Sequence, residues 1–297
     1  MKVGYVGLGA MGGALASHLV EKHSLSVLDL NRDVVASFVG RGARGAENGA
    51  DLARGCELVL LCLPRSSDVQ QALFGAKGLA EGLAPGTVVI DQTSGMPSET
   101  REFARELDAR GVKLLDAPVS GAMATAIAGT VSIIASGDRP SFDRVRTVLT
   151  DISPNVFYVG ERVGNGQTMK SVNNMMNTGC RLATLELVAM GRKYGLSLET
   201  MIEALNATTG RNFTTTGMLP AIAEGRQSTK FRLALQVKDA YQAISMGADE
   251  GVTMPVCSVG AGILQIGLNT LGPDAQLEQI IGVVESMAAT RLVASKA

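Results

Sequence analysis

The sequence is poor in the residues that build disulfide and metal sites. It has four cysteines and two histidines among 297 residues. The cysteines are widely separated and none belongs to a C-x-x-C pair, which excludes a disulfide framework and indicates reduced core thiols. We therefore predict no metal site.

Charge of one sign and long apolar runs are also scarce. The net charge is −1 and no basic stripe is visible, so we expect no nucleic-acid partner. No apolar run reaches transmembrane length, so we expect no membrane partner. The chain passes from Met1 and Lys2 directly into an apolar strand, which leaves no room for a signal peptide and favours a cytoplasmic location.

The composition is that of a globular protein, and the pattern of apolar residues differs between the first and second parts of the chain. Hydrophobic residues make up 46% of the chain and charged residues 19%. Up to residue 163, apolar runs alternate with helical stretches. The first helical stretch lies at 11–23. The runs lie at 2–6, 25–29, 58–63, 87–90, 113–116, 130–135 and 156–159. This alternation predicts an α/β domain with one doubly wound parallel sheet.

Residues 164–297 are predicted to form an all-α domain. It opens with a long interdomain helix over 166–195, in which Gly179 and Gly191 indicate close helix packing. Further helical segments follow near 198–208, 235–250, 255–271 and 274–294. Because this region is so apolar, we expect a homodimer or homotetramer in which it covers another subunit, leaving small molecules as the other partners.

A glycine-rich turn follows the first predicted strand. It fits the pattern G-x-G-x-x-G and consists of Gly7, Leu8, Gly9, Ala10, Met11 and Gly12. The first glycine permits a tight turn, the second lets the backbone approach a pyrophosphate, and the third allows close packing of helix on strand. Because the motif follows a strand and opens a helix, residues 1–163 are predicted to be a Rossmann dinucleotide-binding domain.

The second predicted strand ends at Asp29, where a carboxylate can accept hydrogen bonds from the adenosine ribose. A carboxylate there favours NAD and repels a 2′-phosphate. Asn31 and Arg32 follow closely, and Arg32 could meet a 2′-phosphate, so NADP is not excluded.

The proton-transfer residue of such a dehydrogenase is best sought among the lysines. His18 and His23 are the only histidines and lie in the first helical region, which disfavours a histidine acid/base, and no Tyr-x-x-x-Lys pair is present. Lys170 stands at the start of the long helix, with Asn173 and Asn174 on the same face. It could exchange a proton with a substrate oxygen, or it is a surface lysine beside polar capping residues.

The chain resembles the β-hydroxyacid dehydrogenases nearly end to end. Four blocks carry the resemblance: VGYVGLGAMG, the D-A-P-V-S-G-A run from Asp116, GNGQTMKSVNN, and the run from Phe231 to Lys238 and Asp239. The resemblance implies that Lys170 is the catalytic acid/base and that Asn174 helps to hold the substrate and position Lys170.

The resemblance also implies a set of binding residues. The substrate would contact Ser120, Gly121, Ala122, Asn173, Phe231 and Asp239. The cofactor would contact Leu63, Pro64, Ser94 and Lys238 in addition to the glycine turn and Asp29, Asn31 and Arg32. Ala122 departs from the family glycine, and strain is expected if this position requires a positive φ. Arg211 is either a ligand for a second anionic group or a surface arginine.

We therefore expect an NAD-dependent enzyme that interconverts a small β-hydroxy acid and its semialdehyde, with Lys170 as the acid/base. Two alternatives remain. One is an imine reductase on the same fold, which Lys170 disfavours because such sites generally replace the lysine. The other is a non-catalytic nucleotide-binding scaffold, which the intact lysine and asparagines disfavour.

Overall fold

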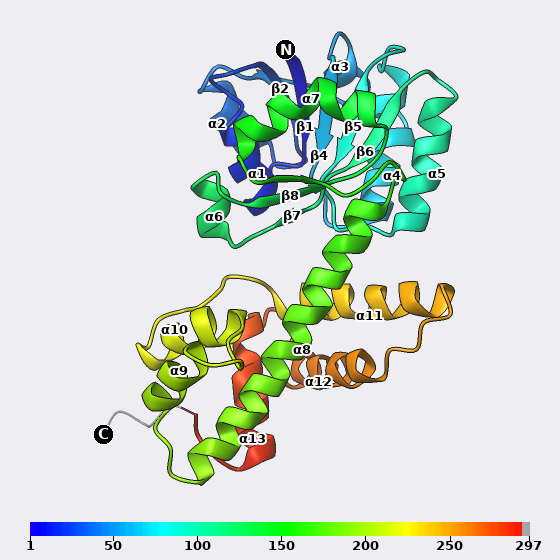
Figure 1. The fold of residues 1–297 in the computed structure, drawn as a ribbon. Helices are drawn as coiled ribbons and strands as arrows, with labels where there is room; N and C mark the ends of the chain where they lie inside the picture. Colours follow the sequence, from blue (N-terminus) through cyan, green and yellow to red (C-terminus); the bar gives the residue numbers. More distant parts are fainter. Residues whose placement is uncertain (293–297) are drawn as a thin grey trace. The chain divides into compact units, whose positions relative to one another are not determined.

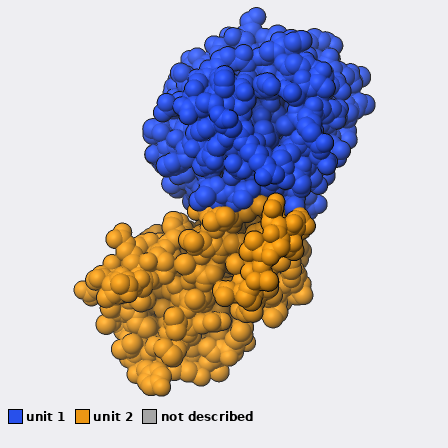
Figure 2. Space-filling model, turned by 45° about the vertical axis from the view of Figure 1, so that its right-hand side comes forward, with its two compact units in different colours: residues 1–170 blue, residues 171–297 orange. Residues whose placement is uncertain are grey.

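A computed structural model describes residues 1–292 of the chain (Figure 1). The chain divides into two compact units, Met1–Lys170 and Ser171–Ala297, coloured separately in Figure 2. The sequence placed the domain boundary at 163–164. No helix among the described residues is long and apolar enough to cross a membrane.

The first unit is built on a six-stranded parallel sheet. Its strands are β1 (Lys2–Val6), β2 (Ser24–Leu28), β3 (Arg44–Gly45), β4 (Leu58–Leu61), β5 (Val88–Asp91) and β6 (Lys113–Asp116). Their spatial order is β3-β2-β1-β4-β5-β6. The strand order therefore reverses between β1 and β4, which is where α/β sheets of this kind bind nucleotides. The predicted Rossmann fold is confirmed.

Helices cover both faces of this sheet. They are α1 (Ala10–Ser17), α2 (Arg32–Val39), α3 (Gly49–Ala53), α4 (Ser66–Phe74), η1 (Leu79–Glu81), α5 (Pro97–Asp108), α6 (Met123–Ile127) and α7 (Arg139–Ile152). One core cluster packs α1, α2, α6 and α7 on one face, and a second packs α3, α4 and α5 on the other. Almost every residue of β4 and β5 is fully buried, which explains their continuous apolar sequence.

The apolar runs near 130–135 and 156–159 do not extend the main sheet, so that prediction is wrong. They form β8 (Ser132–Ala135) and β9 (Val156–Tyr158), which join β7 (Val119–Ser120) in a separate three-stranded sheet. Pro118 lies between β6 and β7 and has no N–H to donate to a ladder. Among the described residues, the backbone pairing between β6 and the region of this second sheet is an isolated bridge of Asp116 with Ser136.

The first helix is shorter than predicted. It ends at Ser17 rather than near residue 23. Beyond it the backbone bonds shift to the tighter i−3 spacing, as in the bonds from the His18 N–H to Leu15 O and from the Lys22 N–H to Leu19 O. These turns bury Leu19 while leading the chain back to β2.

The second unit is helical, as predicted. The long helix α8 (Asn165–Lys193) runs into it from the first unit, and α9 (Leu198–Asn206), a π-helical turn (Thr214–Met218), α10 (Leu219–Ala223), α11 (Leu233–Asp249), α12 (Pro255–Leu271), η3 (Leu277–Gln279) and α13 (Ile280–Ala288) follow. The π-helical turn and α10 were not predicted. Gly191 lies against Met201, as expected for close packing, but a side chain at Gly179 would meet open space.

The last predicted helix, over 274–294, is also shorter. Residues 274–276 are not helical because Gln276 pairs with Arg232 in a β-bridge. Helix α13 then stops at Ala289, whose φ of 46° is left-handed and ends the helix. Residues 293–294 of this prediction lie outside the described residues.

Candidate functional site

The glycine turn packs tightly at the point where the strand order reverses. Gly7 has a φ of 90°, and a side chain on it would collide with the carbonyl oxygen of Cys62, directly after β4. A side chain on Gly12 would collide with the carbonyl oxygen of Gly7. Both positions therefore require glycine, for the reasons predicted from the motif.

The second glycine of the turn, Gly9, faces open space instead. No atom lies within 4 Å of where a side chain on Gly9 would begin, and Gly9 and Ala10 are both exposed. Gly9 is the N-cap of α1 and supplies no side chain to the first N–H groups of the helix. Leu8 is buried and Met11 is half-buried beside this bare backbone. The turn thus offers uncapped donors to an anion such as a pyrophosphate.

Asp29 lies at the end of β2 beside this turn. Its two carboxylate oxygens accept hydrogen bonds from the Leu8 N–H at 2.6 Å and the Asn31 N–H at 2.7 Å. Asn31 also caps α2, because its side-chain oxygen accepts from the Asp33 N–H. The carboxylate is therefore held in one orientation, and the remaining lone pairs of its oxygens can still accept ribose hydroxyls.

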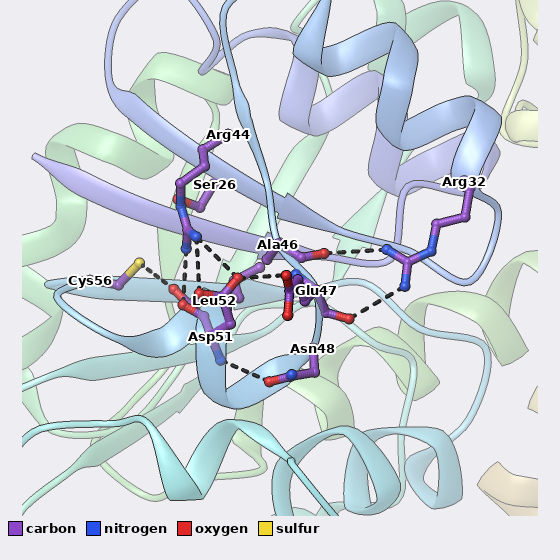
Figure 3. A network of polar contacts seen from close by, with 9 residues as sticks. All are labelled: Ser26, Arg32, Arg44, Ala46, Glu47, Asn48, Asp51, Leu52 and Cys56. Carbon is purple, nitrogen blue, oxygen red and sulfur yellow. Dashed lines mark hydrogen bonds and ion pairs between the residues drawn. The ribbon is translucent and has the colours of Figure 1, made fainter.

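Arg32 points toward a different loop (Figure 3). Its guanidinium donates to the carbonyl oxygens of Ala46 and Glu47, both at 3.3 Å. The same loop is braced by Asp51, whose carboxylate accepts from Arg44 and from the Glu47 N–H. Arg32 is exposed, and its guanidinium already donates to two backbone carbonyl oxygens.

The predicted cofactor residues after β4 and β5 meet at the same edge of the sheet. The Leu63 N–H donates to the Thr93 hydroxyl at 3.1 Å, so the two loops are directly joined. Leu63 is half-buried, Pro64 is exposed and Ser94 is half-buried.

The predicted carboxylate-binding loop follows directly on β7. Ser120 is half-buried, and Gly121 and Ala122 are exposed. A side chain on Gly121 would collide with the Thr125 hydroxyl, so this position requires glycine. Ala122 has a φ of −84° and begins α6. Its backbone is unstrained, so alanine is accommodated where the family has glycine.

A buried carboxylate that sequence analysis did not assign connects this region to α8. Asp116 accepts hydrogen bonds from the Ser136 hydroxyl at 2.5 Å, the Gly164 N–H at 2.7 Å and the Gln167 N–H at 2.8 Å. Desolvation raises the pKa of Asp116 in spite of these donors. The carboxylate thereby satisfies backbone groups at the start of α8 that have no partner within the helix.

The Gln167 side chain makes a second connection. Its amide donates to the Asp91 carboxylate at 3.2 Å and to the Thr93 carbonyl oxygen at 3.4 Å. Lys170, half-buried, follows one turn later on the same helix. The start of α8 is thus held against the ends of β5 and β6, next to the loop that contains Ser94.

The predicted residues of the second unit form a continuous polar chain. The Asn173 amide donates to the Asn174 side-chain oxygen at 3.2 Å, and the Asn174 amide donates to the Asp239 carboxylate at 2.8 Å. Lys238 forms an ion pair with the same carboxylate at 3.2 Å. Asp239 therefore orients Asn174 and Lys238. Phe231 is half-buried against the core of this unit.

The remaining candidates have structural roles. Nε2 of His18 contacts the Ala126 carbonyl oxygen, and Nε2 of His23 contacts the Asp151 carboxylate. All four cysteines are free; Cys56 is buried, and Cys62, Cys180 and Cys257 are half-buried. Asp116, at the end of the apolar strand β6, did carry a signal in the sequence. A carboxylate directly after an apolar strand must find donors when it is buried.

Comparison with known proteins identifies the family of the chain. Residues 2–160 match the family model described as the NAD binding domain of 6-phosphogluconate dehydrogenase, and residues 164–284 match that described as NAD-binding of NADP-dependent 3-hydroxyisobutyrate dehydrogenase. The fold and the glycine turn thus define an NAD(P)-binding oxidoreductase. The chain belongs to the β-hydroxyacid dehydrogenase family.

Individual relatives cover nearly the whole chain. It is 32% identical to a 2-(hydroxymethyl)glutarate dehydrogenase of Eubacterium barkeri over 90% of this chain and 89% of the relative. It is 34% identical to a 3-hydroxyisobutyrate dehydrogenase of Pseudomonas aeruginosa over 82% and 84%. The solved 3-hydroxyisobutyrate dehydrogenase of Mycobacterium tuberculosis, at 24% identity, has the same fold, with a TM-score of 0.87 over 95% of this chain and 98% of that one.

The buried carboxyl of Asp91 generates a prediction about stability and pH. Burial raises its pKa from 3.8 to about 7. A raised carboxyl pKa stabilises the fold fully below about pH 4, and this contribution is lost as the pH rises through about 7. Relative to wild type, Asp91→Asn should therefore gain about 2 kcal/mol in free energy of unfolding between about pH 5 and pH 8, measured by urea denaturation.

Glu99→Gln, at an exposed position of α5, is the control and should follow the wild-type pH dependence. Parallel stability curves for Asp91→Asn and wild type would show that Asp91 does not titrate in this range.

Proposed function

We propose that the enzyme interconverts a small β-hydroxy acid and its semialdehyde, with a small carboxylate as substrate. The observation that supports this most directly is the attachment of the start of α8, with Lys170 one turn beyond Gln167, to the ends of β5 and β6. The glycine turn and Asp29 lie at the same edge of that sheet. When bound there, nicotinamide accepts or donates the hydride.

In this proposal Lys170 moves the proton. As the hydroxyl is oxidised, the Lys170 amine accepts its proton, and in the reverse direction the ammonium returns it to the carbonyl oxygen. Asn174 holds the substrate and positions Lys170, and Asp239 fixes the orientation of the Asn174 amide. The Ser120 hydroxyl and the backbone of Gly121 and Ala122 hold the substrate carboxylate.

The other predicted residues complete the assignment. The proposed cofactor contacts are the glycine turn with Asp29, Asn31, Arg32, Leu63, Pro64, Ser94 and Lys238. Phe231, Asp239 and Asn173 are assigned to the substrate side. An imine reductase on the same fold is the competing function, and imines belong in the substrate panel beside semialdehydes.

Lys170→Ala should lower kcat by at least about 100-fold, because it removes the group that exchanges the proton. The rate is followed by NADH absorbance with a panel of hydroxy acids and semialdehydes. Lys193→Ala, at the exposed end of the same helix, is the matched control and should keep the wild-type kcat. Wild-type kcat in Lys170→Ala would end the lysine mechanism.

We infer that NAD is preferred over NADP. The Asp29 carboxylate would repel a 2′-phosphate, and Arg32 already donates to the Ala46 and Glu47 carbonyl oxygens. Wild type should therefore favour NADH over NADPH by at least about tenfold in kcat/KM, and Asp29→Asn should narrow that ratio. Arg32→Ala should leave the ratio unchanged. A clear NADPH preference in wild type would refute the assignment.

We also infer a homodimer or homotetramer. Residues 251–273 contain no charged side chain, yet Val256, Val259 and Ile266 of α12 are more than half exposed. An exposed helix face of this composition is typical of an interface between subunits.

Val259→Glu should shift the assembly toward monomer in sedimentation velocity, because it places a charge on that face. Ser37→Glu adds the same charge at an exposed position of α2 and should leave the sedimentation coefficient unchanged. A monomeric wild type, or an unaltered Val259→Glu assembly, would exclude this face as the interface.

A further inference from the structure

Gln167, on the first turn of α8, contacts two buried carboxylates at the end of the main sheet. Asp91 and Asp116 are register partners at the ends of β5 and β6, so their side chains project from the same face of the sheet. The Gln167 N–H donates to the Asp116 carboxylate at 2.8 Å, and its side-chain amide donates to the Asp91 carboxylate at 3.2 Å. One residue therefore attaches the helix to two neighbouring strands.

The same amide reaches the loop that follows β5. Its Nε2 also donates to the Thr93 carbonyl oxygen at 3.4 Å, and that oxygen accepts from the Gly95 N–H at 2.9 Å in a tight turn. A side chain on Gly95 would begin 3.0 Å from Nε2 of Gln167, so glycine permits this close approach. Ser94, the proposed cofactor contact, lies between Thr93 and Gly95.

This loop is fixed on both sides of Ser94. Before it, the Thr93 N–H donates to the Asp91 carboxylate at 2.9 Å. After it, the Met96 N–H donates to the Ser66 hydroxyl, at the start of α4, at 2.8 Å. The loop around Ser94 is therefore a rigid reference against which the glutamine can fix the position of the helix.

The Gln167 side chain is not fully satisfied where it is buried. The residue is 1% exposed, and its Oε1 has no hydrogen-bond partner among residues 1–292. A buried carbonyl oxygen without a partner costs about 1–3 kcal/mol. The two N–H groups of the amide nevertheless match the two acceptors that they meet. The glutamine is therefore better explained by the position that it gives to the helix than by a gain in stability.

Lys170 depends on that position. It follows Gln167 by three residues, which places it about 4.5 Å further along the axis and on the same face of the helix. A movement of the first turn would therefore displace the Lys170 amine relative to the Ser94 loop. A misplacement of about 1 Å at a reacting group can cost roughly 100-fold in rate.

We propose that Gln167 is a positioning residue, whose side-chain amide sets the place of the Lys170 amine relative to the Ser94 loop on the cofactor side of the site. The proposal rests on the proposed function, because Gln167 acts through Lys170 as the acid/base. Gln167 contacts neither substrate nor cofactor in this arrangement. Its effect is therefore on the rate of the chemical step and not on cofactor affinity.

The first test is Gln167→Met, which keeps the approximate size of the side chain and removes both N–H donors. The single-turnover oxidation of bound NADH by a semialdehyde should slow by about 10- to 100-fold. The Kd for NADH, from fluorescence titration, should be unchanged. Thr168→Val, at an exposed position of the same turn, is the matched control and should keep the wild-type rate.

An exchange of the bonding groups tests the contact itself. Gln167→Glu sets two acceptors against each other and Asp91→Asn sets two donors, so each variant should lose rate. In Asp91→Asn/Gln167→Glu the new amide can donate to the new carboxylate, and the rate should recover at least about tenfold over Gln167→Glu. Measurement at pH 8 keeps the wild-type Asp91 carboxyl, whose pKa burial raises to about 7, largely ionised. No recovery would overturn the proposal.

A combination with Lys170→Ala separates positioning from a purely structural role. Because Gln167 acts through Lys170, Gln167→Met/Lys170→Ala should be no slower than Lys170→Ala, whereas independent losses would multiply. Multiplied losses, or a raised Kd for NADH with a wild-type rate, would overturn the positioning role. A wild-type rate in Gln167→Met beside an inactive Lys170→Ala would overturn that role alone. Wild-type turnover in Lys170→Ala would overturn the proposed mechanism as well.

Discussion

The carboxylate of Asp116 is the contact on which the site of the first unit depends. It accepts one hydroxyl and two backbone N–H groups, and these donors come from the end of β8 and from the start of α8. Gly166 must be glycine because a side chain there would collide with the carbonyl oxygen of Ile134 and approach Asp116. A buried carboxylate with this many donors rigidifies its surroundings, since losing any donor would leave a desolvated group unpaired. The start of α8 is thereby attached to the sheet.

This attachment explains why the proposed proton transfer is assigned to a residue on a helix rather than on a flexible loop. Lys170 follows the anchored turn directly, so its backbone is held by the bonds of Gln167 to Asp91 and Thr93. Asn174 is held separately, by Asp239 on α11, within the second unit. One continuous helix thus carries two polar groups whose orientation is set by different neighbours. Groups held by rigid elements and further hydrogen bonds keep the precise geometry that proton transfer needs.

Much of this could be predicted from sequence, for physical reasons. The alternation of apolar runs with helical stretches predicted the main sheet. Gly7 and Gly12 were identified because only glycine tolerates a backbone carbonyl oxygen so close to its Cα. The β7–β9 sheet was missed because an apolar run does not reveal which strand it pairs with. The role of Asp116 was missed because its donors lie 20 to 51 residues away. Asn174 and Asp239 are 65 residues apart, and only the resemblance to a family placed both in one site.

The two arginines of the second unit, Arg211 and Arg181, also show what sequence analysis could not predict. Arg211 attracted attention because it lies in the helical domain, where family members differ, whereas Arg181 lies in an ordinary helical sequence and drew none. Periodicity places Arg181 at the edge of the buried face of α8 but cannot say whether its charge is paired. The structure shows a charge that is desolvated and unpaired within the described chain, which is unfavourable for folding alone.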